Sequence, residues 1–141
     1  MLYVIRPYGD WIKEHVFAIL EQCGVATDPV KVVNHPVSLD TIAEIFAQTH
    51  PDFVLVPYHA KENINGLQIV LNLREHGLLT KDLPILMPIS IYAAAGFNLT
   101  LGRLPADDQA WFKERVCVLN GPFENHQEHA DQLSQYLKKL P

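Results

Sequence analysis

The 141-residue sequence lacks several features that accompany particular functions. It contains no run of lysine or arginine, and its net charge is −5. A general nucleic-acid-binding protein needs a basic face that displaces counterions, so this class is excluded. No apolar run approaches the ~20 residues that span a membrane. The N-terminus has neither the basic start nor the long apolar stretch of a signal peptide, so we expect no membrane attachment.

Residues that often perform catalysis are also scarce. Serine occurs at Ser38, Ser90 and Ser134 alone, and no Ser-His-Asp arrangement can be picked out. No glycine-rich phosphate-binding loop follows a strand. The two cysteines, Cys23 and Cys117, fall inside apolar patterns and are expected to be buried thiols, which favours a reducing, cytoplasmic compartment.

The composition is that of an ordinary globular protein, with 48% hydrophobic and 19% charged residues. A chain of this length fits a single domain, residues 1–141. Folding at this size removes roughly 70% of the unfolded chain's surface from water, so a hydrophobic core can form without disulfides or metals.

Apolar runs typical of buried strands alternate with segments of helical periodicity. The run at 53–56 is apolar at every position, which indicates a parallel strand covered on both faces. Helix stops and caps, such as Gly24, Ser38 and Gly77, separate the segments. The predicted strands are 2–5, 29–35, 52–57, 83–90 and 115–120, and the predicted helices are 11–24, 38–50, 66–77, 105–114 and one following Pro122. Residues 91–104 are predicted as a loop or a frayed helix.

Strands that alternate with helices form a parallel sheet with right-handed crossovers. We therefore predict an α/β flavodoxin-like three-layer sandwich, with a five-stranded parallel sheet of order 2-1-3-4-5 and helices on both faces. Ligands of such folds bind in the crevice at the carboxyl ends of strands 1 and 3. The side chains expected at this rim are Arg6, Pro7, Tyr58, His59, Lys61, Ser90 and Gly121.

The order of elements, with "PDFVLVPYHAKENINGLQIVLNLREHG", "LPILMPIS" and the final "VLNGPF", resembles a response-regulator receiver domain over nearly the whole chain. In that family the third strand ends at a phosphorylatable aspartate, and a glycine opens the next helix eight residues later. Gly66 matches this glycine, so the resemblance places Tyr58 where the aspartate should be. The resemblance also implies a cis peptide bond at Gly121-Pro122.

The departures from the receiver pattern are consistent with one another. The acidic pair that holds Mg²⁺ after the first strand is replaced by Arg6 and Pro7, and the lysine after the fifth strand is replaced by Gly121. Ser90 matches the hydroxyl residue after the fourth strand. Mg²⁺ requires hard oxygen ligands, and phosphoryl transfer depends on its charge. We therefore predict a pseudo-receiver that retains the fold, lacks the phosphorylation chemistry, and uses no cofactor or metal.

Three interpretations of Tyr58 and His59 remain open. In the first, Tyr58 fills the vacated pocket with its ring packed and its hydroxyl in water, and the chain signals through protein contact. In the second, Arg6, His59 or Lys61 hold a small ligand, so the crevice serves as a sensor. In the third, His59 acts as the base of a small α/β enzyme, although no partner nucleophile stands out at the rim.

A partner surface is expected where receivers commonly pair, at the fourth helix, the fifth strand and the fifth helix. Trp111 and Phe112 are adjacent, so one helix face cannot bury both. Phe112 fits the core, and we expect Trp111 to be partly exposed and to anchor a homodimer or a protein partner beside Tyr136. In the alternative, Trp111 lies flat on its own domain. His126 and His129 are three residues apart and could share a metal, but a solvated face without a metal is favoured.

Overall fold

The computed structural model describes residues 1–5, 11–33, 38–58 and 64–141. The strands are β1 (Leu2–Ile5), β2 (Val30–Val33), β3 (Phe53–Leu55), β4 (Ile85–Ile89) and β5 (Cys117–Asn120). The helices are a π-helical turn η1 (Ile12–Val16), α1 (Phe17–Gln22), α2 (Leu39–Thr49), α3 (Gly66–Glu75), α4 (Ala94–Gly102), α5 (Ala106–Arg115) and α6 (His126–Lys139).

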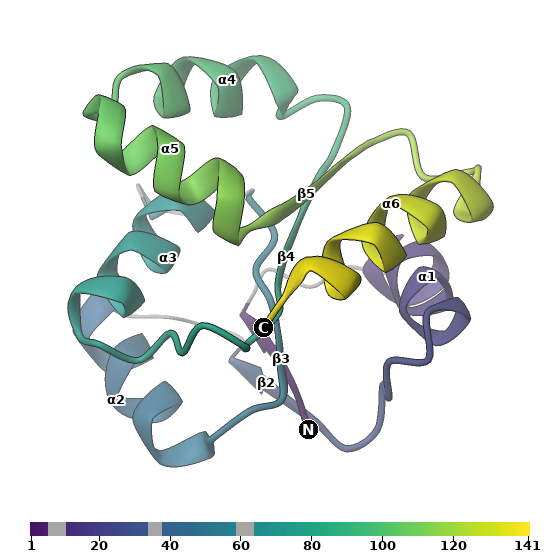
Figure 1. Ribbon diagram of the computed structural model, residues 1–141, viewed down its shortest axis with the longest axis horizontal. Coiled ribbons are helices and arrows are strands. Elements are labelled where there is room, and N and C mark those ends of the chain that lie inside the picture. Colours follow the sequence, from purple (N-terminus) through teal and green to yellow (C-terminus); the bar gives the residue numbers. More distant parts are fainter. Residues whose placement is uncertain (6–10, 34–37, 59–63) are drawn as a thin grey trace.

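The strands form one parallel sheet of order β2-β1-β3-β4-β5. This order is the flavodoxin-like order predicted from the sequence. The three strands β1, β3 and β4 are fully buried, which explains their continuous apolar sequences. In Figure 1, α1 and α6 lie on one side of the sheet, and α2, α3, α4 and α5 lie on the other.

The sheet separates two apolar clusters. The larger cluster lies under α2 to α5 and includes Tyr3, Phe46, Leu73, Phe97 and Phe112. The smaller lies under α1 and α6 and includes Leu20, Leu55, Leu119, Phe123 and Leu133. Tyr3 and Phe112 are completely buried, as a residue at the centre of such a core must be.

Side-chain caps fix where the helices begin. The Ser38 hydroxyl accepts a hydrogen bond from the Thr41 amide at 3.1 Å and starts α2. Asn65 and Gln68 form a reciprocal capping box at the start of α3. Asn125 accepts from the Glu128 amide at 3.1 Å and starts α6. Each cap satisfies a backbone N–H that the helix itself leaves unpaired.

The segment between β4 and β5 differs from the prediction. Residues expected to form a loop or a frayed helix contain the regular helix α4, so α4 and α5 together connect these two strands. Phe97 is the residue of α4 that is buried. The Gln109 side chain donates to the carbonyl of Leu104 at 2.7 Å and thereby fixes the turn between the helices. The Gly121-Pro122 bond is cis, as predicted.

Candidate functional site

Tyr58 lies three residues beyond the end of β3, at the carboxyl end of the sheet. Its amide donates to the carbonyl of Pro88 at 3.3 Å, which continues the pairing with β4. Its side chain is 9% exposed, and its ring meets the ring of Phe97 edge-on at 5.2 Å. The hydroxyl, which we expected to lie in water, donates to Thr100 Oγ1 at 3.1 Å. Tyr58 thus connects the end of the central strand to α4.

Thr100 extends this connection along α4. Its hydroxyl donates to the Gly96 carbonyl at 2.8 Å, so it accepts from Tyr58 and donates to its own helix. The contacts of Phe97 and Thr100 with Tyr58 were not predicted, because residues 91–104 were not expected to form a regular helix. Their three-residue spacing on a helix would have placed them on neighbouring positions of one face.

Gly66 approaches Tyr58 closely at the start of α3. Its amide donates to the Tyr58 carbonyl at 3.0 Å. A Cβ atom at this position would lie 2.9 Å from the Pro57 carbonyl oxygen and 3.0 Å from the Tyr58 Cα atom. A side chain therefore cannot be placed here without moving the backbone at the end of β3. The position matched to the receiver glycine has a steric reason to be glycine in this chain.

Gly121 lies at the end of β5, where the resemblance implies a lysine. Its amide donates to the Ile89 carbonyl at 2.7 Å. An added Cβ atom would lie 3.0 Å from the Ile91 amide nitrogen and 3.3 Å from the Ile89 carbonyl oxygen. Ser90 lies on the neighbouring turn, where its carbonyl accepts from the Ala93 amide at 3.0 Å. A side chain at 121 would therefore crowd the turn after β4, which would have to shift by a few tenths of an ångström.

The structure brings together part of the predicted rim. Tyr58, Ser90 and Gly121 follow the adjacent strands β3, β4 and β5. Arg6, Pro7, His59 and Lys61 lie outside the described residues. The described part of the rim contains no carboxylate and no lysine.

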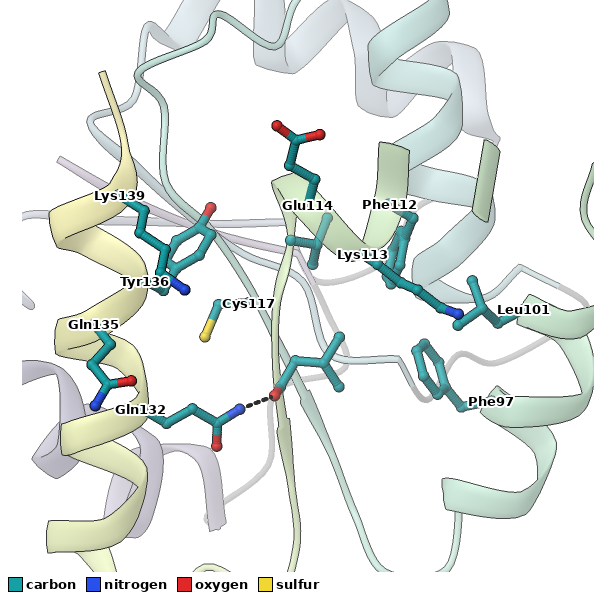
Figure 2. A pocket seen from close by; sticks show the side chains of 12 residues that line it. Phe97, Leu101, Phe112, Lys113, Glu114, Cys117, Gln132, Gln135, Tyr136 and Lys139 are labelled. Carbon is teal, nitrogen blue, oxygen red and sulfur yellow. Dashed lines mark hydrogen bonds between the residues drawn. The ribbon is translucent and has the colours of Figure 1, made fainter. Parts of the chain in front are cut away.

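A second candidate site is a pocket of about 540 Å³ over β5. In Figure 2, Gln132, Gln135, Tyr136 and Lys139 of α6 form one wall, and Phe97, Leu101 and Phe112 lie opposite. Cys117 lies between these walls, and burial, with a smaller contribution from nearby Cys23, raises the pKa of its thiol to about 12. A thiol with so high a pKa is protonated near neutral pH and is a poor nucleophile.

Three polar side chains of α6 bond to the backbone beside this pocket. His129 Nε2 lies 2.8 Å from the Asn120 carbonyl oxygen, and Gln132 Nε2 donates to the Val118 carbonyl at 2.9 Å. The Tyr136 hydroxyl donates to the Arg115 carbonyl at 2.7 Å and accepts from the Ile85 amide at 3.0 Å. These residues are spaced three and four apart on one helix face. His129 and Gln132 supply partners for the edge strand β5, whereas Tyr136 bonds to the first residue of β4 and the last residue of α5. Burial raises the pKa of Tyr136, so its hydroxyl remains a donor.

Trp111 and Tyr136 contact different apolar clusters. Trp111 is partly exposed, as expected, and packs against the larger apolar cluster, with the Arg74 guanidinium 4.7 Å from its ring centre. Arg74 in turn forms an ion pair with Asp108 at 2.9 Å. Tyr136 packs against the smaller cluster on the other side of the sheet. The role of Trp111 and Tyr136 as a partner anchor stays a prediction.

The histidines of α6 also differ from expectation. His129 is buried rather than solvated, and its ring nitrogens face the carbonyl oxygens of Asn120 and Asn125. His126 Nε2 lies 2.9 Å from His15 Nδ1 on η1. Among the described residues, no group of three or more His, Cys, Asp or Glu side chains could hold a metal ion. No described helix combines the length and apolarity needed to cross a membrane.

Two solved structures share this architecture. A response regulator receiver protein from Sinorhizobium medicae WSM419 matches 98% of this chain and 94% of its own, with a TM-score of 0.59 and 16% identity. A sensor protein from Polaromonas sp. JS666 matches 99% of this chain and 98% of its own, with a TM-score of 0.62 and 16% identity. At this identity the similarity establishes a common fold. No family model and no curated protein matches the sequence.

Proposed function

We propose that the chain is a pseudo-receiver: a signalling module with a receiver-like fold that does not accept a phosphoryl group and acts through protein contact in the cytoplasm. The observation that carries the proposal is the state of Tyr58. A receiver needs a free carboxylate at this position, whereas here a buried phenol packs on Phe97 and donates to Thr100. The hydroxyl is already engaged by protein.

The surroundings of Tyr58 support the same conclusion. Phosphoryl transfer depends on cations that neutralise the developing negative charge. Mg²⁺ prefers carboxylate oxygens, which the described rim residues Tyr58, Ser90 and Gly121 do not supply. The sequence has Gly121 where a receiver has its lysine, and Arg6 and Pro7 where it has its acidic pair. The residue types that supply cations to a receiver site are therefore missing from these positions.

A role in protein contact is favoured over a catalytic role because hydrogen bonds hold the carboxyl end of β3 in one arrangement. The hydrogen bonds from Tyr58 to Thr100 and from Thr100 to Gly96 fix the end of β3 against α4. Where a receiver has an aspartate that gains charge on phosphorylation, this chain has a hydrogen bond from Tyr58, at the end of β3, to Thr100 of the surface helix α4. A partner that binds this surface meets a preformed shape, which reduces the entropy lost on binding.

A phosphodonor assay tests the proposal. The protein is incubated with acetyl phosphate and Mg²⁺, and its intact mass is measured beside an active receiver as the positive control. We expect no mass increase of one phosphoryl group. A stoichiometric, acid-labile adduct on this chain would refute the proposal.

Two variants make the assay sharper. Tyr58→Asp restores the carboxylate but not the lysine or the acidic pair, so we expect it to remain unmodified. Tyr58→Phe, which keeps the ring and removes the hydroxyl, is the matched control for folding. Efficient phosphorylation of Tyr58→Asp would show that the rest of a working site is present and would contradict the proposal.

A further inference from the structure

The outward face of α4 and of the turn that precedes it is apolar. Ile91, Tyr92 and Leu99 are 58%, 96% and 57% exposed, and they are three of the four large exposed hydrophobic residues in the described chain. In Figure 1, α4 lies at the periphery of the molecule, farther from the sheet than α5. An exposed tyrosine can bury about 150–250 Å² when it is covered. Apolar patches of several hundred Å² on a soluble protein commonly mark an interaction site.

The two sides of this segment differ in burial but not in polarity. Phe97, Thr100 and Leu101 face the protein and are buried or partly buried. The exposed positions recur at the helical spacing of three and four residues, and most of them are apolar or small. They are Ile91, Tyr92, Ala95, Gly96, Asn98, Leu99, Gly102 and, at the C-cap of α4, the charged Arg103. A surface helix normally presents polar residues to water, so α4 has the sequence of a helix covered on both sides.

The glycines of α4 have no explanation within one molecule. An added Cβ atom at Gly96 or Gly102 would meet no atom within 4 Å, and neither residue has a positive φ. Glycine within a helix is less stable than alanine because it loses more backbone freedom on folding. The absent side chains leave shallow depressions on the outward face, beside the protruding Tyr92 and Leu99. A second helix could approach closely at these depressions.

The charge distribution indicates what covers this face. Residues 83–102 contain no charged side chain, whereas the whole chain carries a net charge of −5. Two copies of an acidic protein repel each other, and residues near a two-fold axis meet their own counterparts. The uncharged face of α4 is where such a pairing brings no like charges together.

We propose that two copies of this chain pair through the outward faces of α4, antiparallel about a two-fold axis. With the axis between Ala95 and Gly96, Tyr92 of one copy lies against Leu99 of the other, and the small residues allow close contact at the centre. The face is self-complementary, as an isologous interface requires. It is also short compared with the about 800 Å² per partner of a standard interface, so the dimer dissociates on dilution.

In this pairing a second copy of the chain is the partner of the protein contact proposed above, and this assignment rests on that proposed function. The same helix receives the hydrogen bond from Tyr58 on its inner side, through Thr100. The strand-end site would thereby hold the dimerisation helix in position. The phosphodonor assay and the measurement of association are independent, so the failure of one proposal is distinguishable from the failure of the other.

Sedimentation equilibrium of the full chain over a range of protein concentrations tests the pairing. We expect a reversible monomer–dimer equilibrium for the native sequence. Leu99→Lys places a charge against Tyr92 of the other copy and should weaken association at least about tenfold, since a charge without a partner is costly to remove from water. Val30→Lys, which changes the fourth exposed hydrophobic residue on the distant edge strand β2, should leave association unchanged.

Gly96→Ala provides a test that does not depend on loss of folding. Alanine favours the helix, so the variant should melt at a higher temperature at dilutions where the protein is monomeric. The added methyl group should at the same time weaken the dimer several-fold, because it fills the depression at the axis. A native chain that remains monomeric at high concentration would overturn the pairing, as would a dimer unaffected by both Leu99→Lys and Gly96→Ala.

Discussion

The two faces of the sheet are held by different kinds of polar contact. On the face covered by α2 to α5, polar side chains connect one helix or turn to another. Asn72 of α3 donates to the Leu39 carbonyl of α2 at 3.1 Å, and Arg74 pairs with Asp108 of α5. On the face covered by α1 and α6, Gln132 of α6 bonds directly to the backbone of β5, and Tyr136 to that of β4.

The difference follows from the position of β5 at the edge of the sheet. A central strand finds partners for its backbone groups on both neighbours, whereas an edge strand leaves every second residue unpaired on one side. Buried backbone groups need partners, and here α6 provides some of them through its side chains. Both faces cover central strands, and the face under α2 to α5 is sealed mainly by apolar side chains. The comparison predicts different sensitivities to mutation on the two sides.

The largest expected effect is the loss of volume from the larger cluster. Phe112→Ala removes a completely buried ring and should lower the free energy of unfolding by about 3–5 kcal/mol. On the other face, Gln132→Ala removes one hydrogen bond to Val118 and should lower it by about 0.5–1.5 kcal/mol. Urea unfolding followed by circular dichroism measures both.

Gln135→Ala is the control for Gln132→Ala. Gln135 is exposed on the same helix and has no hydrogen-bond partner within the described chain, so its removal should change the free energy of unfolding little. If Gln132→Ala and Gln135→Ala were equally mild, the side chains of α6 would not stabilise the edge strand. The contrast between the two faces would then rest on packing alone.

An effect smaller than that of Phe112→Ala distinguishes two buried tyrosines. Tyr136→Phe leaves the Ile85 amide without its acceptor and should destabilise the fold by about 1–3 kcal/mol. The Tyr3 hydroxyl, in contrast, is buried with no partner in the described structure, and burial raises its pKa to about 12. Tyr3→Phe should therefore be neutral or stabilising. Equal losses in the two variants would contradict the expected difference between a hydrogen-bonded and an unbonded buried hydroxyl.

The sequence was sufficient to predict the sheet order and most elements. Buried parallel strands are continuous apolar runs, and residues such as Ser38 and Asn65 mark helix starts by local chemistry. These signals depend on neighbours in the chain. The burial of Phe112 was also predicted from local sequence, because two adjacent residues on a helix cannot both point to the buried face.

The features that were missed depend on contacts distant in sequence. The segment containing α4 is apolar on both sides, so it lacks the contrast by which helical periodicity is recognised. His129 was expected in solvent, but the Asn120 carbonyl at the edge of the sheet gives it a buried partner. Trp111 is partly exposed as predicted, but its contact with Arg74 of α3 was not. None of these partners follows from the local sequence.

The central claim is that the strand-end site around Tyr58 does not respond to Mg²⁺ or to a phosphoryl group. Two-dimensional NMR of the ¹⁵N-labelled chain, titrated with Mg²⁺ and then with beryllium trifluoride as a phosphoryl mimic, tests it most directly. We predict no saturable shifts in the amide signals of Tyr58, Ser90, Thr100 and Gly121. Saturable shifts at these residues, dependent on both additions, would show a working receiver pocket and would contradict the claim.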